Sequence, residues 1–351
     1  MTTPPDSPAS GPQTFPPVSV VMVVRDEERH LRAAVDRILT QDYPAPVECV
    51  IAVGPSRDRT REVAEAIAAA DPRVVVVGNP TGRTAAGLNA AIAACSAYPV
   101  VVRVDGHALL PDGYIRRGVA VLQETGAANV GGVMAAEGET AFERAVARAM
   151  TSPLGVGNAR FHNGGDPGPV DTVYLGVFRR EALDAVGGYD ERFTRAQDYE
   201  MNVRIRESGG VIWFTPELHV TYRPRSSVRA LARQYFEYGR WRWIVTRTHP
   251  RSLRPRYLAA PVAVAGLVAG TVAGAAGWRV GWLAPIGYAA LLVGGSAVAG
   301  RTLEGRALVR LPVALATMHL AWGTGFLLSM ARRADREAAV DAAAGIGMPS
   351  L

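Results

Sequence analysis

Strand-like and helix-like segments alternate through residues 18–107, and this alternation constrains the fold more than any other feature. Apolar, β-branched runs predict strands at 18–24, 47–53, 73–77 and 99–107. The segments between them predict helices, the first capped by Asp26 and ending near Gln41. Such alternation is typical of a doubly wound α/β fold with a mainly parallel sheet.

The fourth predicted strand ends on residues that suit a ligand site. Its valines predict a strand buried on both faces, and Asp105, Gly106 and His107 follow. Side chains two residues apart leave a strand on the same side, so Asp105 and His107 are expected to converge where α/β sheets bind ligands. A carboxylate and an imidazole there suit a divalent cation that holds a phosphate. A plain turn, with Asp105 as its cap and His107 solvated, explains the same residues.

Beyond this strand, the pattern predicts further strands and helices around a long loop. We expect helices at 111–124 and 196–208 and strands at 128–135 and 171–178. The Gly- and Pro-rich stretch 151–169 lacks periodicity, which is typical of a functional loop. Asp198 lies at the start of a predicted helix, where a capping acid is the simplest interpretation.

Absent motifs and residue types argue against several functions. The first predicted strand is followed by Arg-Asp-Glu rather than by the Gly-x-Gly-x-x-Gly of dinucleotide-binding dehydrogenases. The chain contains no lysine, which excludes a phosphate loop ending in Gly-Lys-Ser. Its two cysteines, Cys49 and Cys95, have no metal-ligand spacing and are interpreted as small buried residues of a reducing compartment.

The positive charge is concentrated in one segment. Ten arginines and a single acid, Glu237, lie between Arg223 and Arg256, whereas the whole chain has a net charge of +6. A cationic stripe directly before apolar runs indicates a membrane surface with anionic headgroups. Nucleic acid is a competing partner, but no nucleic-acid-binding motif accompanies the stripe.

Apolar runs in the last third predict membrane helices. Residues 258–277 and 282–299 carry no charge and lack a polar face, which favours transmembrane spans over buried soluble helices. Residues 311–330 form a third run that contains His319, and here a buried helix remains an alternative. Two to three spans are therefore expected.

Arginines flanking these runs predict their orientation. If the catalytic domain is cytoplasmic, Arg279 falls outside and Arg301, Arg306 and Arg310 fall inside, as the positive-inside rule prefers. A third full span would place Arg332, Arg333 and Arg336 outside. The third segment is therefore re-entrant or interfacial, or it is an exception to the rule.

In chain order, these boundaries predict a disordered Pro-rich leader (1–17), a catalytic domain (18–225), a basic interfacial helix (226–256), a transmembrane region (257–331) and a tail (332–351). The leader lacks the basic start and apolar middle of a signal peptide.

Several motifs together resemble the family 2 glycosyltransferases of the GT-A fold, over roughly residues 18–241. The motifs are Val-Val-Arg-Asp-Glu-Glu at 23–28, Ser56-x-Asp58-x-Thr60, Gly87-Leu88-Asn89, Asp105-x-His107, Gly187-Gly188-Tyr189-Asp190-Glu191, Gln197-Asp198 and the Gln234–Arg240 segment. Within the family, the chain is most similar to the ExoA-like membrane enzymes of exopolysaccharide assembly. Their Arg-Val-Asp-x-His, Gly155-Val156-Gly157-x-Ala159 and Asp171-Thr172-Val173-Tyr174 stretches recur here.

The resemblance implies roles for individual residues. Asp198 would be the general base, and Asp105 and His107 would hold Mn²⁺ or Mg²⁺ against the diphosphate of a nucleotide-sugar. The donor would be contacted by a set of five residues: Arg25, Glu27, Ser56, Arg83 and Asp105. A further set would belong to the acceptor side and its loop: Gly157, Asp171, Gln197, Gln234, Arg240 and Trp241.

Two departures from the family pattern shape the predicted function. Val53 stands where members often place an Asp that contacts the base, which puts uridine specificity in doubt. Arg240 and Trp241 follow Gln234 by six and seven residues, so the Gln-x-x-Arg-Trp signature of processive synthases is not matched. We therefore expect an inverting transferase that adds one sugar to a lipid-linked or envelope glycan at the cytoplasmic face of the inner membrane. The alternatives are a processive synthase, a silent sugar-nucleotide- or lipid-binding subunit and, as a lesser possibility, a nucleotidyltransferase.

Overall fold

The computed structural model describes residues 14–332 and contains one eight-stranded sheet. Its order is β3-β2-β1-β4-β7-β5-β8-β6. The strands are β1 (Val18–Val24), β2 (Val47–Val53), β3 (Val74–Gly78), β4 (Val100–Asp105), β5 (Asn129–Ala136), β6 (Gly168–Pro169), β7 (Tyr174–Arg179) and β8 (Ile212–Tyr222). Strands β1 to β4 are parallel, β7 is antiparallel to β4 and β5, and β5 is parallel to β8. The predicted mainly parallel α/β sheet is confirmed.

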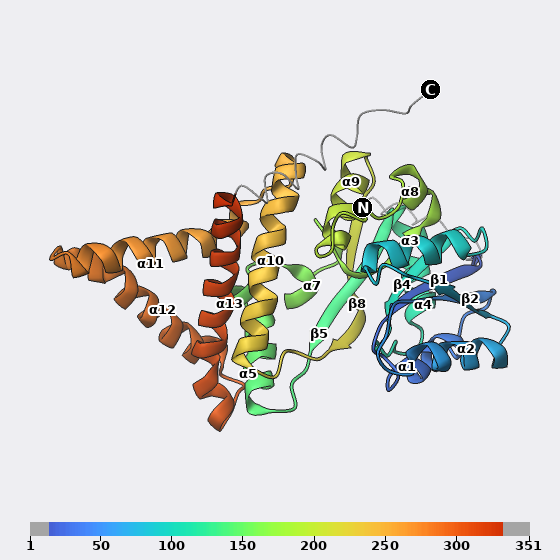
Figure 1. Cartoon of the computed structure of the whole chain (residues 1–351), viewed down its shortest axis with the longest axis horizontal. Coiled ribbons are helices and arrows are strands. Elements are labelled where there is room, and N and C mark those ends of the chain that lie inside the picture. The colour runs from blue at the N-terminus through green and yellow to red at the C-terminus, as the bar shows by residue number, and fades with distance from the viewer. Residues whose placement is uncertain (1–13, 333–351) are drawn as a thin grey trace, which may run out of the picture.

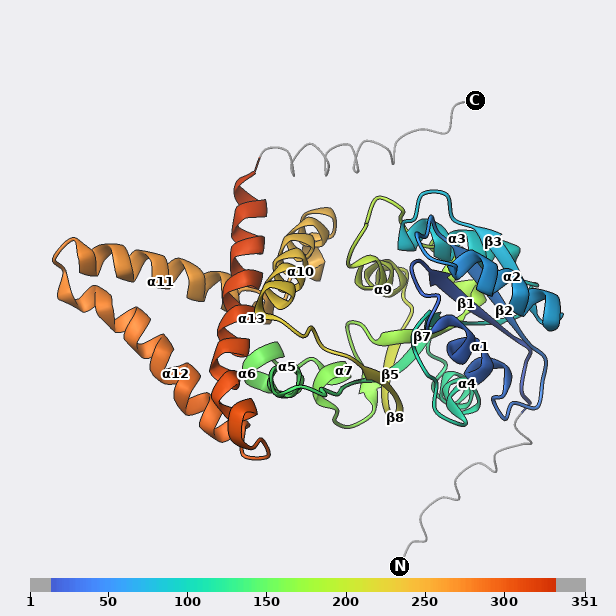
Figure 2. The same ribbon diagram turned by 60° about the horizontal axis from the view of Figure 1, so that its bottom comes forward.

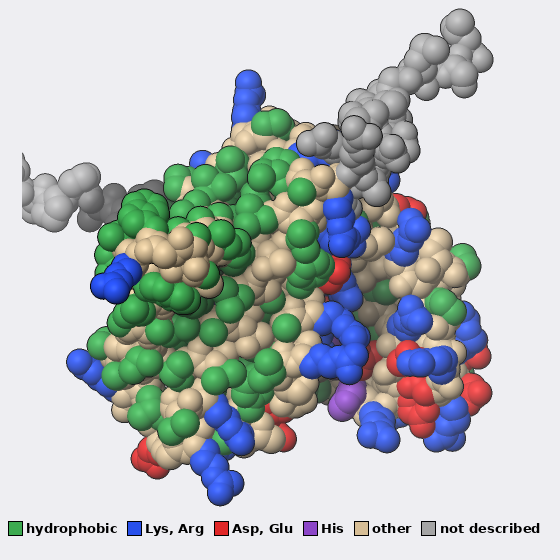
Figure 3. All heavy atoms as spheres, turned by 60° about the vertical axis from the view of Figure 1, so that its left-hand side comes forward, with side chains coloured by type: hydrophobic (Ala, Val, Ile, Leu, Met, Phe, Trp, Pro, Cys, Tyr) green, Lys and Arg blue, Asp and Glu red, His purple; other side chains and the backbone are tan. Residues whose placement is uncertain are grey.

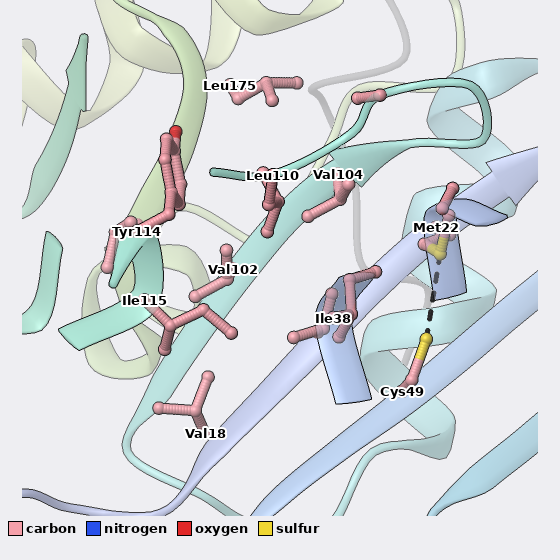
Figure 4. Close-up of a cluster of buried hydrophobic side chains, with 14 of the residues drawn as sticks. Val18, Met22, Ile38, Cys49, Val102, Val104, Leu110, Tyr114, Ile115 and Leu175 are labelled. Atoms are coloured by element: carbon pink, nitrogen blue, oxygen red, sulfur yellow. Dashed lines mark hydrogen bonds between the residues drawn. The ribbon is translucent and has the colours of Figure 1, made fainter. Parts of the chain in front are cut away.

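Helices cover both faces of this sheet (Figure 1). They are α1 (Leu31–Leu39), α2 (Thr60–Ala70), α3 (Thr84–Ala94), α4 (Tyr114–Thr125), α8 (Arg180–Ala185) and α9 (Gln197–Glu207). Helices α1, α2 and α4 pack on one core, whereas α3, α8 and α9 pack on the other. Alternate residues of β1 enter opposite cores, Met22 on the α1 side and Val21 on the α3 side. Figure 4 shows the first core around Met22, Val102 and Ile115.

Local predictions were wrong at two places near the first turn and the central strand. Asp26 does not cap α1: it has a positive φ of 57°, and its carboxylate accepts hydrogen bonds from the backbone and side chain of Arg57. Strand β4 ends at Asp105, so His107 lies in the following turn. The strand alternation that was expected to align Asp105 and His107 therefore stops before His107.

The predicted loop 151–169 is partly helical, and a helix that the sequence pattern missed precedes it. The helices are α5 (Ala141–Met150), α6 (Pro153–Val156) and α7 (Arg160–Asn163). Thr140 and Glu143 form a capping box at the start of α5, and Ser152 caps α6. The loop is therefore held by local caps, and it lies between the sheet and the C-terminal helices (Figure 2).

The C-terminal part contains four long helices joined by short turns: α10 (Val228–Thr248), η1 (Pro250–Ser252), η2 (Pro255–Tyr257), α11 (Ala259–Ala275), η3 (Arg279–Trp282), α12 (Leu283–Ala299) and α13 (Gly305–Ala331). Three segments of the described chain are long and apolar enough to cross a membrane: 255–275, 279–299 and 305–331. Helices α11 and α12 form a V that projects from the body, whereas α13 packs along α10 (Figures 1 and 2). Most of the predicted leader (1–17) and tail (332–351) lies outside the described residues.

Candidate active site

The candidate site lies at the carboxyl edge of the sheet, beside the neighbouring strands β1 and β4. The chain proceeds from β1 to β2 and β3 on one side and continues at β4 on the other, so the connections diverge between β1 and β4. Such a switch point is where open α/β sheets bind ligands. The loops after β1, β2 and β4 carry most of the residues that the sequence predicted to contact a donor.

A single arginine joins the two acids that the sequence placed far apart. Arg103 Nη1 lies 2.5 Å from Asp198 Oδ2, and its Nη2 lies 2.9 Å from Asp105 Oδ1. The Arg103 side chain comes from β4 and is only 11% exposed. Because a guanidinium presents several donors in a fixed plane, Arg103 fixes the relative positions of both carboxylates. The structure thus brings Asp105 and Asp198 together, whereas the bridging arginine was not predicted.

Asp198 has the surroundings of a proton acceptor. It is the second residue of α9, and Gln197 Nε2 lies 3.4 Å from its Oδ2. Burial raises the pKa of Asp198, and the charge of Arg103 opposes this rise. Its Oδ1 atom is buried, and an interaction with the Tyr189 side chain lowers the pKa of Asp198. The side chain as a whole is 32% exposed, so a ligand can reach the carboxylate.

Asp105 and His107 contact different partners. Asp105 Oδ2 accepts a long hydrogen bond of 3.4 Å from the Tyr174 hydroxyl. His107 Nδ1 lies 2.8 Å from Glu27 Oε1, and this contact raises the pKa of His107. Across residues 14–332, no group of three or more His, Cys, Asp or Glu side chains is arranged to hold a metal ion. A cation at this site would therefore need ligand atoms from a bound substrate.

The predicted donor-side residues lie on adjoining loops after β1, β2 and β3. The Asp26 amide donates to Ser56 Oγ at 3.2 Å, which ties the β1 loop to the β2 loop. A side-chain atom at Gly82 would lie 3.6 Å from Arg25 Nη1, so the turn that precedes Arg83 adjoins Arg25. Gly82 has a positive φ of 64°, which glycine adopts without strain. Glu27 is the residue that connects this group to His107.

The predicted acceptor-side residues do not form one cluster. Gly157 lies near Arg256, and Asp171 pairs with Arg254 and Arg256. Three others are on α10 and make separate contacts: Gln234 with Tyr222 and Tyr238, Arg240 with Glu237, and Trp241 with Phe193. Gln197 alone adjoins Asp198 directly.

Two functional features were missed from the sequence. A charged residue within the valine run of β4 was the available signal for Arg103, because an arginine in a buried strand requires an acidic partner. The four arginines around Asp171 come from three separate segments, and no sequence spacing connects them.

Comparisons with known proteins agree with this architecture. Residues 16–245 match the family model described as "Glycosyltransferase like family 2". The chain is 34% identical over 327 residues to the succinoglycan biosynthesis protein ExoA of Rhizobium meliloti (strain 1021), covering 90% of this chain and 96% of that protein. It is 21% identical over 231 residues to dolichyl N-acetyl-alpha-D-glucosaminyl phosphate 3-beta-D-2,3-diacetamido-2,3-dideoxy-beta-D-glucuronosyltransferase of Methanococcus voltae, covering 63% and 71% of the two chains.

A solved structure supports the fold. The mannosyltransferase PcManGT from Pyrobaculum calidifontis, in complex with GDP-Man and Mn²⁺, superposes with a TM-score of 0.57 at 20% identity, covering 88% of this chain and 87% of that one. Fold and family match together define a GT-A glycosyltransferase. The chain belongs to glycosyltransferase family 2.

Proposed function

We propose that this enzyme is an inverting transferase that moves one sugar from a nucleotide-sugar to a lipid-linked glycan of exopolysaccharide or envelope assembly. The observation that carries the proposal is the Asp105–Arg103–Asp198 arrangement at the carboxyl edge of the sheet. Its similarity to a succinoglycan biosynthesis protein supports a role in exopolysaccharide assembly. The dolichyl-linked sugar in the name of the archaeal relative supports a lipid-linked acceptor.

In this mechanism, the Asp198 carboxylate takes the proton of the acceptor hydroxyl as the hydroxyl oxygen attacks the anomeric carbon. The bond from the anomeric carbon to the nucleoside diphosphate breaks as the new glycosidic bond forms on the opposite face, which inverts the configuration. Arg103 holds the Asp198 carboxylate through Oδ2 and so keeps it in a fixed orientation. Arg25, Glu27, Ser56 and Arg83 would bind the donor nucleotide.

Asp105 and His107 would hold a divalent cation whose remaining ligands come from the donor diphosphate. Asp105 Oδ2 has only a weak protein contact, and the His107 side chain is 55% exposed. Bound there, Mn²⁺ or Mg²⁺ would neutralise the charge that develops on the departing diphosphate. The imidazole ligand suits Mn²⁺ better than Mg²⁺.

Removal of divalent cations is expected to abolish transfer. An excess of EDTA should lower the rate of donor turnover by at least about a hundredfold, because the leaving group loses its charge compensation. Mn²⁺ added back should restore the rate, and His107→Ala should raise the Mn²⁺ concentration needed for half-maximal rate. Full activity in EDTA would contradict the metal role of Asp105 and His107.

Addition of a single sugar is expected because the α10 residues are engaged elsewhere. Trp241 packs on Phe193 at 5.9 Å between ring centroids, and Arg240 pairs with Glu237. We therefore do not assign these residues to the binding of a growing chain. Purified enzyme in liposomes, supplied with labelled nucleotide-sugars and a lipid extract, should give one product larger by one sugar. A ladder of long chains would indicate a processive synthase instead.

The membrane arrangement that best fits the helices has α11 and α12 crossing and α13 at the surface. Helices α11 and α12 are almost entirely exposed and apolar, and they contribute to the green face in Figure 3. The backbone of α13 instead lies in direct contact with the backbone of the arginine-rich helix α10. A side chain at Gly239 would overlap the Trp322 carbonyl, and one at Gly325 would overlap the Phe236 carbonyl. A helix in such contact with a charged neighbour is poorly placed in hydrocarbon.

This arrangement predicts opposite exposure for two positions. In cells, R279C should react with a membrane-impermeant maleimide from outside, whereas R332C should react only after the membrane is opened. A Cys95→Ser background serves as the control, because Cys49 is buried. Labelling of R332C in intact cells would indicate that α13 is a third span.

A further inference from the structure

A polar pocket lies beside β6, at the edge of the sheet opposite β3. It has a volume of about 430 Å³ and is lined by the α7 segment, β6 and the residues that follow it, α9 and the turn before α11. Strand β6 is at one edge of the sheet, whereas β3 and β2 are at the other. The nucleotide part of a donor bound beside β1 and β2 therefore does not reach this pocket.

The pocket has an excess of positive charge. Four arginines line it, Arg160, Arg206, Arg254 and Arg256, together with the single acid Asp171. Asp171 pairs with Arg254 at 3.1 Å, Arg256 at 3.0 Å and Arg206 at 3.6 Å. One carboxylate cannot satisfy the donors of four guanidinium groups. The pocket is therefore electrostatically suited to an anion that accepts several hydrogen bonds.

Arg206 supplies a second, independent indication that the pocket binds a ligand. Its Nε and Nη2 atoms are buried and have no hydrogen-bond partner among the described residues. Unsatisfied guanidinium donors cost free energy unless a ligand or water accepts their hydrogen bonds. Phosphate oxygens match the planar geometry of such donors.

The position of the pocket identifies the kind of anion. Arg254 and Arg256 belong to the turn that leads into α11, the first predicted membrane span. In Figure 3, arginine side chains gather where the hydrophobic face meets the rest of the molecule. A phosphate bound at this boundary would be at the headgroup level of the bilayer, with the membrane helices beside its lipid chain.

Helix α9 connects this pocket to the proposed base. Asp198, Asn202 and Arg206 follow one another at intervals of four residues along a ridge of the helix. Eight residues of helix correspond to about 12 Å along the axis. An anion at Arg206 and a hydroxyl at Asp198 would therefore be separated by about this distance along the helix.

We propose that the Arg206 pocket binds the phosphate or diphosphate of the lipid-linked acceptor, with at least one acceptor sugar lying between it and Asp198. The proposal rests on the proposed function and names the group by which the acceptor is held. It orders the acceptor as lipid, phosphate, sugar and attacking hydroxyl, from the base of α11 toward the start of α9.

The test measures binding of farnesyl diphosphate to the full-length protein in detergent. EDTA and saturating UDP and GDP are present to keep farnesyl diphosphate out of the donor site, which is then either occupied by a nucleotide or without its metal. We expect R206Q to weaken binding by about ten- to a hundredfold, as loss of hydrogen bonds to a charged group predicts. Arg251→Gln, on the same turn region but outside the pocket, should bind as the unchanged protein does.

Further arms separate the possible outcomes. Farnesol and inorganic diphosphate should each bind at least about tenfold more weakly than farnesyl diphosphate. Equal binding of inorganic diphosphate would show that the pocket is a site for free anions and would overturn the proposal. Unchanged binding by R206Q would also overturn it. If R206Q fails to fold, R254Q takes its place, because Arg254 is half exposed. Turnover by Asp198→Asn tests the transferase function separately, so the two failures are distinguishable.

Discussion

Replacing Asp198 with Asn is expected to lower the rate of sugar transfer by about a hundred- to ten-thousandfold, the usual contribution of a general base. The substituted side chain would keep the size of the original and could still accept a hydrogen bond from Arg103, but an amide cannot take a proton. Donor binding should change little, because most donor-side residues lie on the loops after β1, β2 and β3, and Asp105 keeps its own contact with Arg103. The measurements are the steady-state transfer rate and the affinity for nucleoside diphosphate.

The control for this variant is Asp184→Asn, which removes an exposed carboxyl of α8 on the same side of the sheet. It should transfer sugar at the unchanged rate. Full activity of D198N would remove Asp198 from the mechanism. A parallel loss of nucleotide binding would instead indicate that the variant disturbs the fold.

Replacing Arg103 with Met is expected to have the second largest effect, because it removes the contact shared by both acids. The Asp105 and Asp198 carboxylates would then lack their compensating charge, which should lower the free energy of unfolding by about 2–4 kcal/mol. Transfer should fall by at least about tenfold, because Asp198 would lose the group that orients it. Thermal unfolding and the transfer rate measure the two effects.

The pH profile distinguishes this role of Arg103 from a purely structural one. The base acts when deprotonated, and the pKa of Asp198 is already raised by burial, with Arg103 opposing the rise. Loss of Arg103 should raise that pKa further, so the acidic limb of the rate profile should move to higher pH. Arg103→Lys keeps the positive charge but not the paired geometry. It should therefore return the acidic limb toward its original pH more fully than it restores the transfer rate. A profile unchanged in R103M would contradict this account.

The sequence predicted the sheet well where strands were long and apolar. Strands β1 and β2 begin and end where their valine-rich runs predict, because burial on both faces requires continuous apolar residues. The sequence-based prediction failed at Asp26, because an acid that caps a helix and an acid that binds a neighbouring loop look the same in a sequence. Helix α5 was missed although its capping box is a recognisable start signal.

The candidate site was only partly predictable, for a related reason. Asp105 and Asp198 could be identified from motifs, but their meeting depends on β4 and α9 coming together from distant parts of the chain. Their connection through Arg103 is a property of three-dimensional packing. The arginine pocket is a stronger example, because Arg160, Arg206 and Arg254 have no common motif.

The sequence by itself determined the α/β class, the apolar helices near the C-terminus and the residue types available for chemistry. Periodicity and hydrophobicity act locally, so they can be seen in a linear chain. Only the tertiary structure decided that Arg103 joins the two acids, that α13 packs along α10 and that three arginines pair with Asp171. Electrostatic and packing partners are selected by proximity in space, and contacts between distant segments leave no fixed spacing in the sequence.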